Sequence, residues 1–125
     1  LHDALPILIS CVENEQHEIG GKMVADIFEK NRWDTHCLGA NIPSDDLVRF
    51  CKLVKPDVIC LSVSVYANIV VLLREIAELR EITNVPIIIG GQALGRVGFK
   101  LSKKLKNVFY LVDLEAIENY IKDYV

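Results

Sequence analysis

One histidine, two serines and a pair of glycines lie beside apolar runs of this sequence. Of all its residues, these give the most specific indication of a chemical function. His17 lies in the segment from Glu15 to Gly20 (Glu-Gln-His-Glu-Ile-Gly), between an apolar run and a run with helical spacing. Ser62 and Ser64 follow a second apolar run, and Gly90-Gly91 ends a third. An imidazole can ligate a metal, and glycines let a backbone approach a ligand closely. The group therefore suits a large, flat, metal-bearing ligand better than a phosphate or a peptide.

For these residues to meet, the apolar runs must be strands and the intervening segments helices. Their alternation predicts an α/β fold, a flavodoxin-like (Rossmann-like) five-stranded parallel sheet of order 2-1-3-4-5 with helices on both faces. The strands are expected at 7–12, 35–38, 58–63, 86–89 and 108–111, and helices are expected from 19, from 44 with Ser44 as N-cap, at 67–82, at 99–105 and at 114–124. The inward helix positions include Met23 and Phe28 in the first helix and Leu72, Leu73, Ile76 and Leu79 in the third.

The strand order brings the candidate residues together. In parallel α/β sheets, ligands bind beyond the carboxyl ends of the strands, where the order reverses. Strands one and three would lie side by side at that point, so the loops that carry His17 and Ser62 become neighbours.

Composition sets the limits of this reading. The 125 residues are 51% hydrophobic and 25% charged with a formal net charge of −3, which gives no basic surplus for nucleic-acid binding. No apolar run approaches the ~20 residues of a membrane span, so no membrane partner and a cytoplasmic location are expected. One domain is expected at 7–125, with residues 1–6 disordered or the start of a fragment. The four cysteines form no C-x-x-C pair and are expected to be reduced thiols.

A second histidine provides an internal control. The stretch from Asp34 to Gly39 also matches an acid-x-His-x-x-Gly pattern. Its His36, however, falls within a predicted strand that no helix follows, so it cannot project from a crevice loop. Only His17 has the strand-to-helix context of a ligand.

Each residue of the first segment has a physical reason to be there. A neutral imidazole is a good cobalt ligand, and its second ring nitrogen needs an acceptor to fix the tautomer; Glu15 is the candidate. Gly20 would let the backbone approach a bulky ligand, although helix–sheet packing explains it equally well. We therefore predict a corrinoid site with His17 as the cobalt ligand.

These motifs resemble the cobalamin (vitamin B12)-binding domain of methionine synthase, carbon-skeleton mutases, corrinoid methyl carriers and light-sensing regulators. The matching parts are Glu15-x-His17-x-x-Gly20, Ser62-x-Ser64 and Gly90-Gly91, and the resemblance extends from about Ile7 onward. Glu15 stands where methyl carriers and mutases usually have Asp, so Glu-Gln-His looks more like the sensory and regulatory branch.

The resemblance implies that cobalamin binds base-off, with His17 as lower axial ligand and the displaced dimethylbenzimidazole tail in a slot between strands one and three. It also implies a helical cap or partner domain over the upper corrin face, and a homo-oligomer is left open. The cofactor-binding residues that follow are Glu15, Gln16, His17, Glu18, Ile19, Gly20, Ser62, Ser64, Val65, Gly90, Gly91, Gln92 and Tyr110.

The function expected is a cobalamin-binding module, sensory or carrier, that is not itself an enzyme. One alternative keeps the cofactor and makes the chain a methyl carrier for a separate methyltransferase. The others are a receiver-like or flavodoxin-like interaction domain without a corrinoid and a haem-binding relative. The acidic stretch from Glu13 to Gln16 is unsuited to a flavin phosphate.

Overall fold

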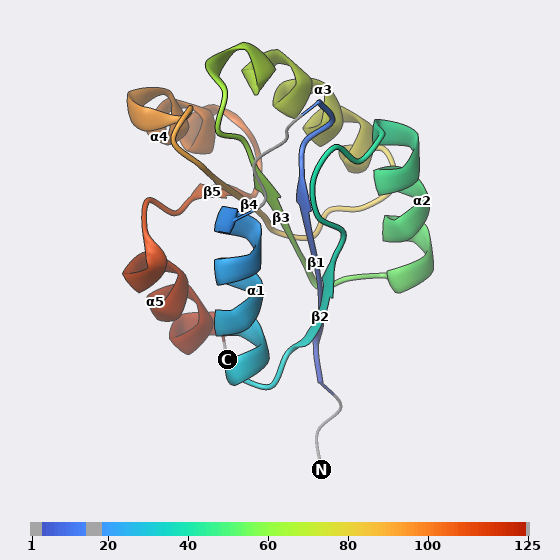
Figure 1. Ribbon diagram of the computed structural model, residues 1–125, viewed down its shortest axis with the longest axis vertical. Coiled ribbons are helices and arrows are strands. Elements are labelled where there is room, and N and C mark those ends of the chain that lie inside the picture. Colours follow the sequence, from blue (N-terminus) through green and yellow to red (C-terminus); the bar gives the residue numbers. More distant parts are fainter. Residues whose placement is uncertain (1–3, 15–18, 125) are drawn as a thin grey trace.

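The computed structural model describes residues 4–14 and 19–124 and shows a parallel sheet between two layers of helices (Figure 1). The sheet has five strands in the order β2-β1-β3-β4-β5. Every neighbouring pair is parallel, which confirms the predicted flavodoxin-like fold. The strands are β1 (Pro6–Cys11), β2 (Asp34–Cys37), β3 (Val58–Ser62), β4 (Ile87–Gly90) and β5 (Val108–Tyr110).

The helices follow the strands in strict alternation along the chain. They are α1 (Ile19–Lys30), α2 (Ser44–Val54), α3 (Ile69–Arg80), α4 (Gly95–Lys104) and α5 (Leu114–Tyr124), and a 3₁₀ turn, η1 (Tyr66–Asn68), leads into α3. Helices α1 and α5 cover one face of the sheet, and α2, α3 and α4 cover the other. The connection after β1 therefore leads to one face, whereas the connection after β3 leads to the opposite face.

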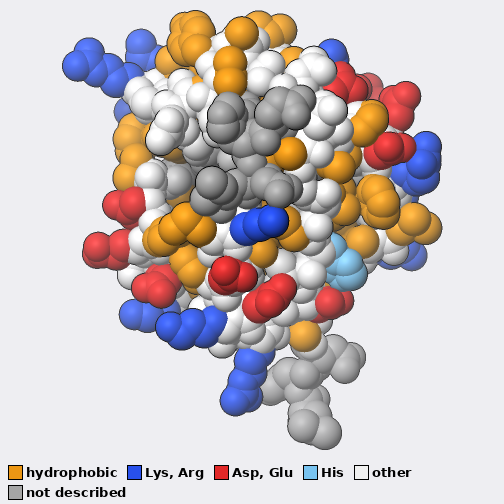
Figure 2. Space-filling view, in the orientation of Figure 1, with side chains coloured by type: hydrophobic (Ala, Val, Ile, Leu, Met, Phe, Trp, Pro, Cys, Tyr) orange, Lys and Arg blue, Asp and Glu red, His pale blue; other side chains and the backbone are white. Residues whose placement is uncertain are grey.

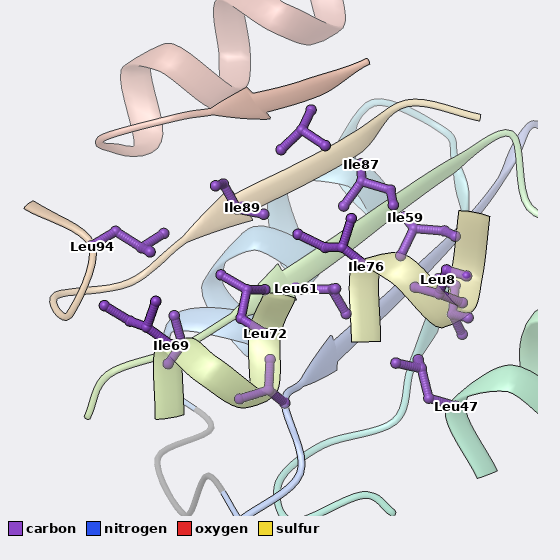
Figure 3. Close-up of a cluster of buried hydrophobic side chains, with 14 of the residues drawn as sticks. Leu8, Leu47, Ile59, Leu61, Ile69, Leu72, Ile76, Ile87, Ile89 and Leu94 are labelled. Atoms are coloured by element: carbon purple, nitrogen blue, oxygen red, sulfur yellow. The ribbon is translucent and has the colours of Figure 1, made fainter. Parts of the chain in front are cut away.

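The side chains at the centre of the sheet are buried because helices cover both of its faces. All five residues of β3 are buried, as expected for a strand with a nearly continuous apolar sequence. On the α3 side, Leu72 and Ile76 point toward the strands (Figure 3), and Leu79 belongs to the same buried cluster. On the other side, Trp33 packs at the C-terminal end of α1. Its ring meets Phe28 and Tyr124 edge-on at centroid distances of 5.1 and 5.0 Å.

Several sequence expectations need correction. Met23 and Leu73 were expected to point inward, yet they are 44% and 38% exposed. Helix α4 begins at Gly95, not at 99, and Pro6 already pairs with Asp34 in the sheet.

Ser44 is also not the N-cap of its helix. It is the first residue of α2, and the carbonyl of Pro43 accepts the first helical hydrogen bonds. The Ser44 hydroxyl is therefore available to another element of the fold.

Candidate functional site

A cavity of about 580 Å³ opens between α1 and α5 above the carboxyl ends of β3 and β4. We call it the α1–α5 cavity. It is lined by Gly20, Gly21, Met23 and Val24 of α1, by Cys60, Leu61, Ser62 and Ser64 at β3, by Ile88, Gly90, Gly91 and Gln92 at β4, and by Leu111, Val112, Asp113, Leu114 and Ile117 at the entry of α5. Most of this lining is apolar or glycine, which suits a flat, largely apolar ligand.

Small residues keep this cavity open. A β-carbon on Gly20 would come within 3.8 Å of Ser62 Oγ, and one on Gly90 within 3.6 Å of the Leu111 carbonyl oxygen. Both residues line the cavity, so any longer side chain at either position would take up its space. Gly90 also follows Ile88 by two residues, so a side chain there would stand on the same face of β4.

Ser62 supplies a polar group in this apolar surrounding. Ser62 is 9% exposed, and its hydroxyl makes no hydrogen bond to any residue that the structure describes. Polar groups in such positions normally have a partner. A hydroxyl left for a ligand, glycines that leave room and an apolar wall fit a heteroaromatic ring that carries a few polar atoms.

Gly91 has a different task from Gly90. Its φ is +117°, and a β-carbon there would overlap the Val63 carbonyl oxygen. Ala93 N–H donates to the same oxygen at 3.4 Å. Gly91 therefore allows the turn after β4 to pass directly against the end of β3.

Most of the predicted residues that the structure describes meet at this cavity. Gly20, Ser62, Ser64, Gly90, Gly91 and Gln92 all line it. Val65 does not line it and is 41% exposed beside η1, at the same edge of the sheet.

Tyr110 lies on the wrong face of the sheet for the predicted role. Its ring packs against Phe99 of α4 at a centroid distance of 4.8 Å, and a β-carbon on Gly98 would touch that ring. Tyr110 therefore belongs to the α4 side, whereas the cavity lies on the α1–α5 side. The prediction failed because β5 is only three residues long, and alternation along it sends Phe109 and Tyr110 to opposite faces.

The cavity does not coincide with the position at which the sequence predicted a slot. The slot was expected between β1 and β3, but these strands are directly paired from Ile7–Val58 to Cys11–Ser62. The space lies over β3 and β4, and its second wall is α5. Sequence reasoning missed that wall, for which the signal was Asp113: its carboxylate accepts from Ala116 N–H at 2.8 Å and begins α5 at the same edge as Gly90-Gly91.

Glu15, Gln16, His17 and Glu18 lie outside the described residues, and Ile19 begins α1 without a described side chain. Their predicted roles therefore remain predictions. The neighbouring Glu13 is described, and it is held by Ser44, Arg74 and Glu75 from the opposite layer of helices.

The structure also describes His36 and the cysteines, which are other potential metal ligands. His36 lies in β2, as expected, with Nε2 3.0 Å from Asp34 Oδ2. Cys11, Cys51 and Cys60 are buried and form no disulfide, and burial raises the pKa of Cys60 to about 12. Within residues 4–14 and 19–124, no three His, Cys, Asp or Glu side chains cluster as a metal site. None of the described helices has both the length and the apolar character needed to cross a membrane.

A family model for the B12 binding domain matches residues 5–112. The fold is also similar to that of solved structures. One is the methanol:cobalamin methyltransferase complex MtaBC from Methanosarcina barkeri (16% identity over 95% of this chain and 45% of that one, TM-score 0.81).

Two further structures show the same fold. A cobalamin-binding protein from Desulfitobacterium hafniense DCB-2 is 20% identical over 98% of this chain and 60% of its own, with a TM-score of 0.72. The Methanosarcina barkeri monomethylamine corrinoid protein is 13% identical over 96% of this chain and 57% of its own, with a TM-score of 0.80. This chain thus spans about half the length of the solved chains that it matches.

Proposed function

Because this chain belongs to the B12-binding domain family, we propose that it holds cobalamin base-off, with His17 as the lower cobalt ligand and the nucleotide tail in the α1–α5 cavity. Cobalamin is the cofactor of the domain, which is a cofactor-binding module. The observation that carries the proposal is the cavity itself. It opens at the carboxyl edge of the sheet and contains the predicted motif residues Gly20, Ser62 and Gly90 in its walls.

The character of the cavity supports the tail as its occupant. Its volume falls within the range of about 300–1,000 Å³ typical of small-molecule pockets. The apolar walls and the glycines suit the faces of a fused aromatic base, and the Ser62 hydroxyl can bind a polar atom of the tail. A cofactor whose tail occupies this cavity would have its macrocycle over the β1–α1 and β3–α3 connections.

The protein's contribution is position, an axial ligand and exclusion of water. Bound cobalamin supplies the organometallic chemistry of its cobalt. His17 would hold the metal through one ring nitrogen, while Glu15 would accept a hydrogen bond from the other and fix the tautomer. Three exposed apolar side chains lie near the same edge, at Val65, Tyr66 and Val70. Figure 2 also shows apolar side chains at the top of the molecule as it is viewed there.

Two roles follow from such a module. Glu-Gln-His at positions 15–17 favours a sensory or regulatory role, in which the state of the upper ligand is passed to a cap or an output domain. The similarity to a methyltransferase complex and to a monomethylamine corrinoid protein favours a methyl carrier as the second candidate. A sensor predicts that its cap or output domain responds differently to bound adenosyl- and hydroxocobalamin. A carrier predicts that a partner methyltransferase methylates the bound cofactor.

The proposal is tested by mixing the purified protein with hydroxocobalamin and desalting it. We expect the pigment to stay with the protein and its absorption spectrum to differ from that of the free cofactor. His17→Ala should alter that spectrum, because it removes the axial ligand, and His36→Ala should not.

The control is well matched, because His36 is the other histidine within an acid-x-His-x-x-Gly pattern and lies in β2. Identical spectra for the wild type and His17→Ala would contradict axial ligation by His17. A protein that elutes colourless would contradict the proposed function as a whole.

A further inference from the structure

A buried carboxylate lies in the apolar stripe of α3, away from the α1–α5 cavity. Glu75 is 1% exposed, because it occupies an inward position between Leu72 and Leu79. A carboxylate this deeply buried is rare unless it is paired. Its Oε1 has no hydrogen-bond partner among the described residues, so all of its bonds are made by Oε2.

The bonds of Oε2 lead to the connection after β1. The Ser44 hydroxyl donates to Glu75 Oε2 at 2.6 Å, and the main-chain N–H of Glu13 donates to the same oxygen at 3.2 Å. We call Glu13, Ser44, Arg74 and Glu75 the Glu13 cluster.

Glu13 is held by its side chain as well as by its backbone. Ser44 N–H donates to Glu13 Oε1 at 3.0 Å, and Arg74 Nη2 donates to Glu13 Oε2 at 2.7 Å. Arg74 also donates to the Ser44 hydroxyl at 2.8 Å, which closes the network. The hydrogen bonds from Ser44 and Arg74 hold the pKa of Glu13 below its ordinary value, while burial raises that of Glu75.

The cluster therefore fixes one residue of the β1–α1 connection to two helices of the opposite layer. The next residue, Asn14, has a φ of +70°, so the chain turns there. The segment that begins at position 15 starts from this turn, and it carries the predicted cobalt ligand.

We propose that the Glu13 cluster is a positioning device, which anchors the base of the 15–18 segment and so determines how completely His17 ligates cobalt. This inference rests on the proposed function, because it assigns the cluster a role toward that cofactor. Glu75 and Ser44 are positioning residues that would act through Glu13.

The test compares hydrogen exchange and cofactor spectra in a set of variants. Ser44→Ala removes the donor to Glu75, and Glu75→Leu removes the acceptor while keeping an apolar side chain of similar size. Glu75→Gln retains one oxygen that can accept both bonds, so it should behave as the wild type. Ser102→Ala is the matched control, because it removes a hydroxyl that accepts Tyr110 N–H at 2.6 Å between other elements.

In the cofactor-free protein, we expect Ser44→Ala and Glu75→Leu to speed amide exchange at residues 12–14 about tenfold, the effect of losing one buried hydrogen bond. Exchange in β3 should stay unchanged. With hydroxocobalamin bound, the same two variants should shift the spectrum part of the way toward that of His17→Ala. Glu75→Gln and Ser102→Ala should do neither.

Each outcome decides between the claims. Unchanged exchange in Ser44→Ala and Glu75→Leu would overturn the anchoring role. Faster exchange with an unchanged spectrum would overturn the link to ligation. If His17→Ala itself leaves the spectrum unchanged, the proposed function fails, and the exchange data still decide whether the cluster anchors this segment.

Discussion

Gly91→Ala is expected to destabilise the fold by at least about 3 kcal/mol. The added β-carbon would overlap the Val63 carbonyl oxygen and carbon, which belong to backbone and cannot rotate away. The φ of +117° adds strain of about 1–3 kcal/mol for any residue with a side chain. Urea denaturation monitored by circular dichroism would measure the loss of unfolding free energy.

Gly90→Ala is the matched control for this substitution. The adjacent glycine has no positive φ, and its β-carbon would meet the Leu111 carbonyl oxygen at 3.6 Å, an ordinary contact. Its unfolding free energy should therefore stay within about 1 kcal/mol of the wild type. A Gly91→Ala protein as stable as Gly90→Ala would show that the turn after β4 does not pass as closely to Val63 as described.

Gly90→Val should weaken cobalamin binding and leave the domain folded. The valine side chain would stand beside Ser62 within the α1–α5 cavity, in the space proposed for the nucleotide tail. Forcing extra methyl groups into occupied space costs about 1–3 kcal/mol, which corresponds to about 5- to 150-fold in the dissociation constant. Titration with hydroxocobalamin, followed by absorbance, would measure this change.

Ile89→Val provides the comparison on the same strand. Ile89 is fully buried but points to the α3 side, so its shortening affects stability and not the cavity. Its dissociation constant should match that of the wild type. Equal affinities for Gly90→Val and the wild type would place the tail of the cofactor somewhere other than this cavity.

Much of the fold follows from the sequence because its strands and helices have distinct apolar periods. The continuous run that forms β3 indicated a central parallel strand, and the structure shows it buried on both faces. Exposed apolar residues were harder to predict. The stripes of α1 and α3 included Met23 and Leu73, which periodicity alone could not separate from the buried positions.

Part of the lining of the α1–α5 cavity follows from the sequence, for reasons of local geometry. Ser62 and Gly90 were expected at the ends of neighbouring strands, and the structure pairs them there, while their binding role stays a prediction. Tyr110 was misplaced because the register of a three-residue strand decides the face of each side chain. The wall supplied by α5 depends on where the last helix crosses the sheet, which no motif encodes.

The burial of Glu75 could have been predicted from its position in the sequence. Periodicity assigned Leu72, Ile76 and Leu79 to the core, and Glu75 falls within the same stripe. What the sequence could not supply was its partner, because Ser44 and Glu13 are 31 and 62 residues away along the chain. Ser44 was assigned to capping α2, a role that Pro43 fulfils through its carbonyl.

The lower axial ligand can be identified most directly by electron paramagnetic resonance of the protein loaded with cob(II)alamin. A nitrogen ligand splits the cobalt lines into triplets when it is ¹⁴N and into doublets when it is ¹⁵N. With ¹⁵N-labelled protein and unlabelled cofactor, ligation by His17 predicts doublets, which disappear in His17→Ala. Triplets from the labelled protein would show that the cofactor's own base still holds the metal, and would contradict the base-off assignment.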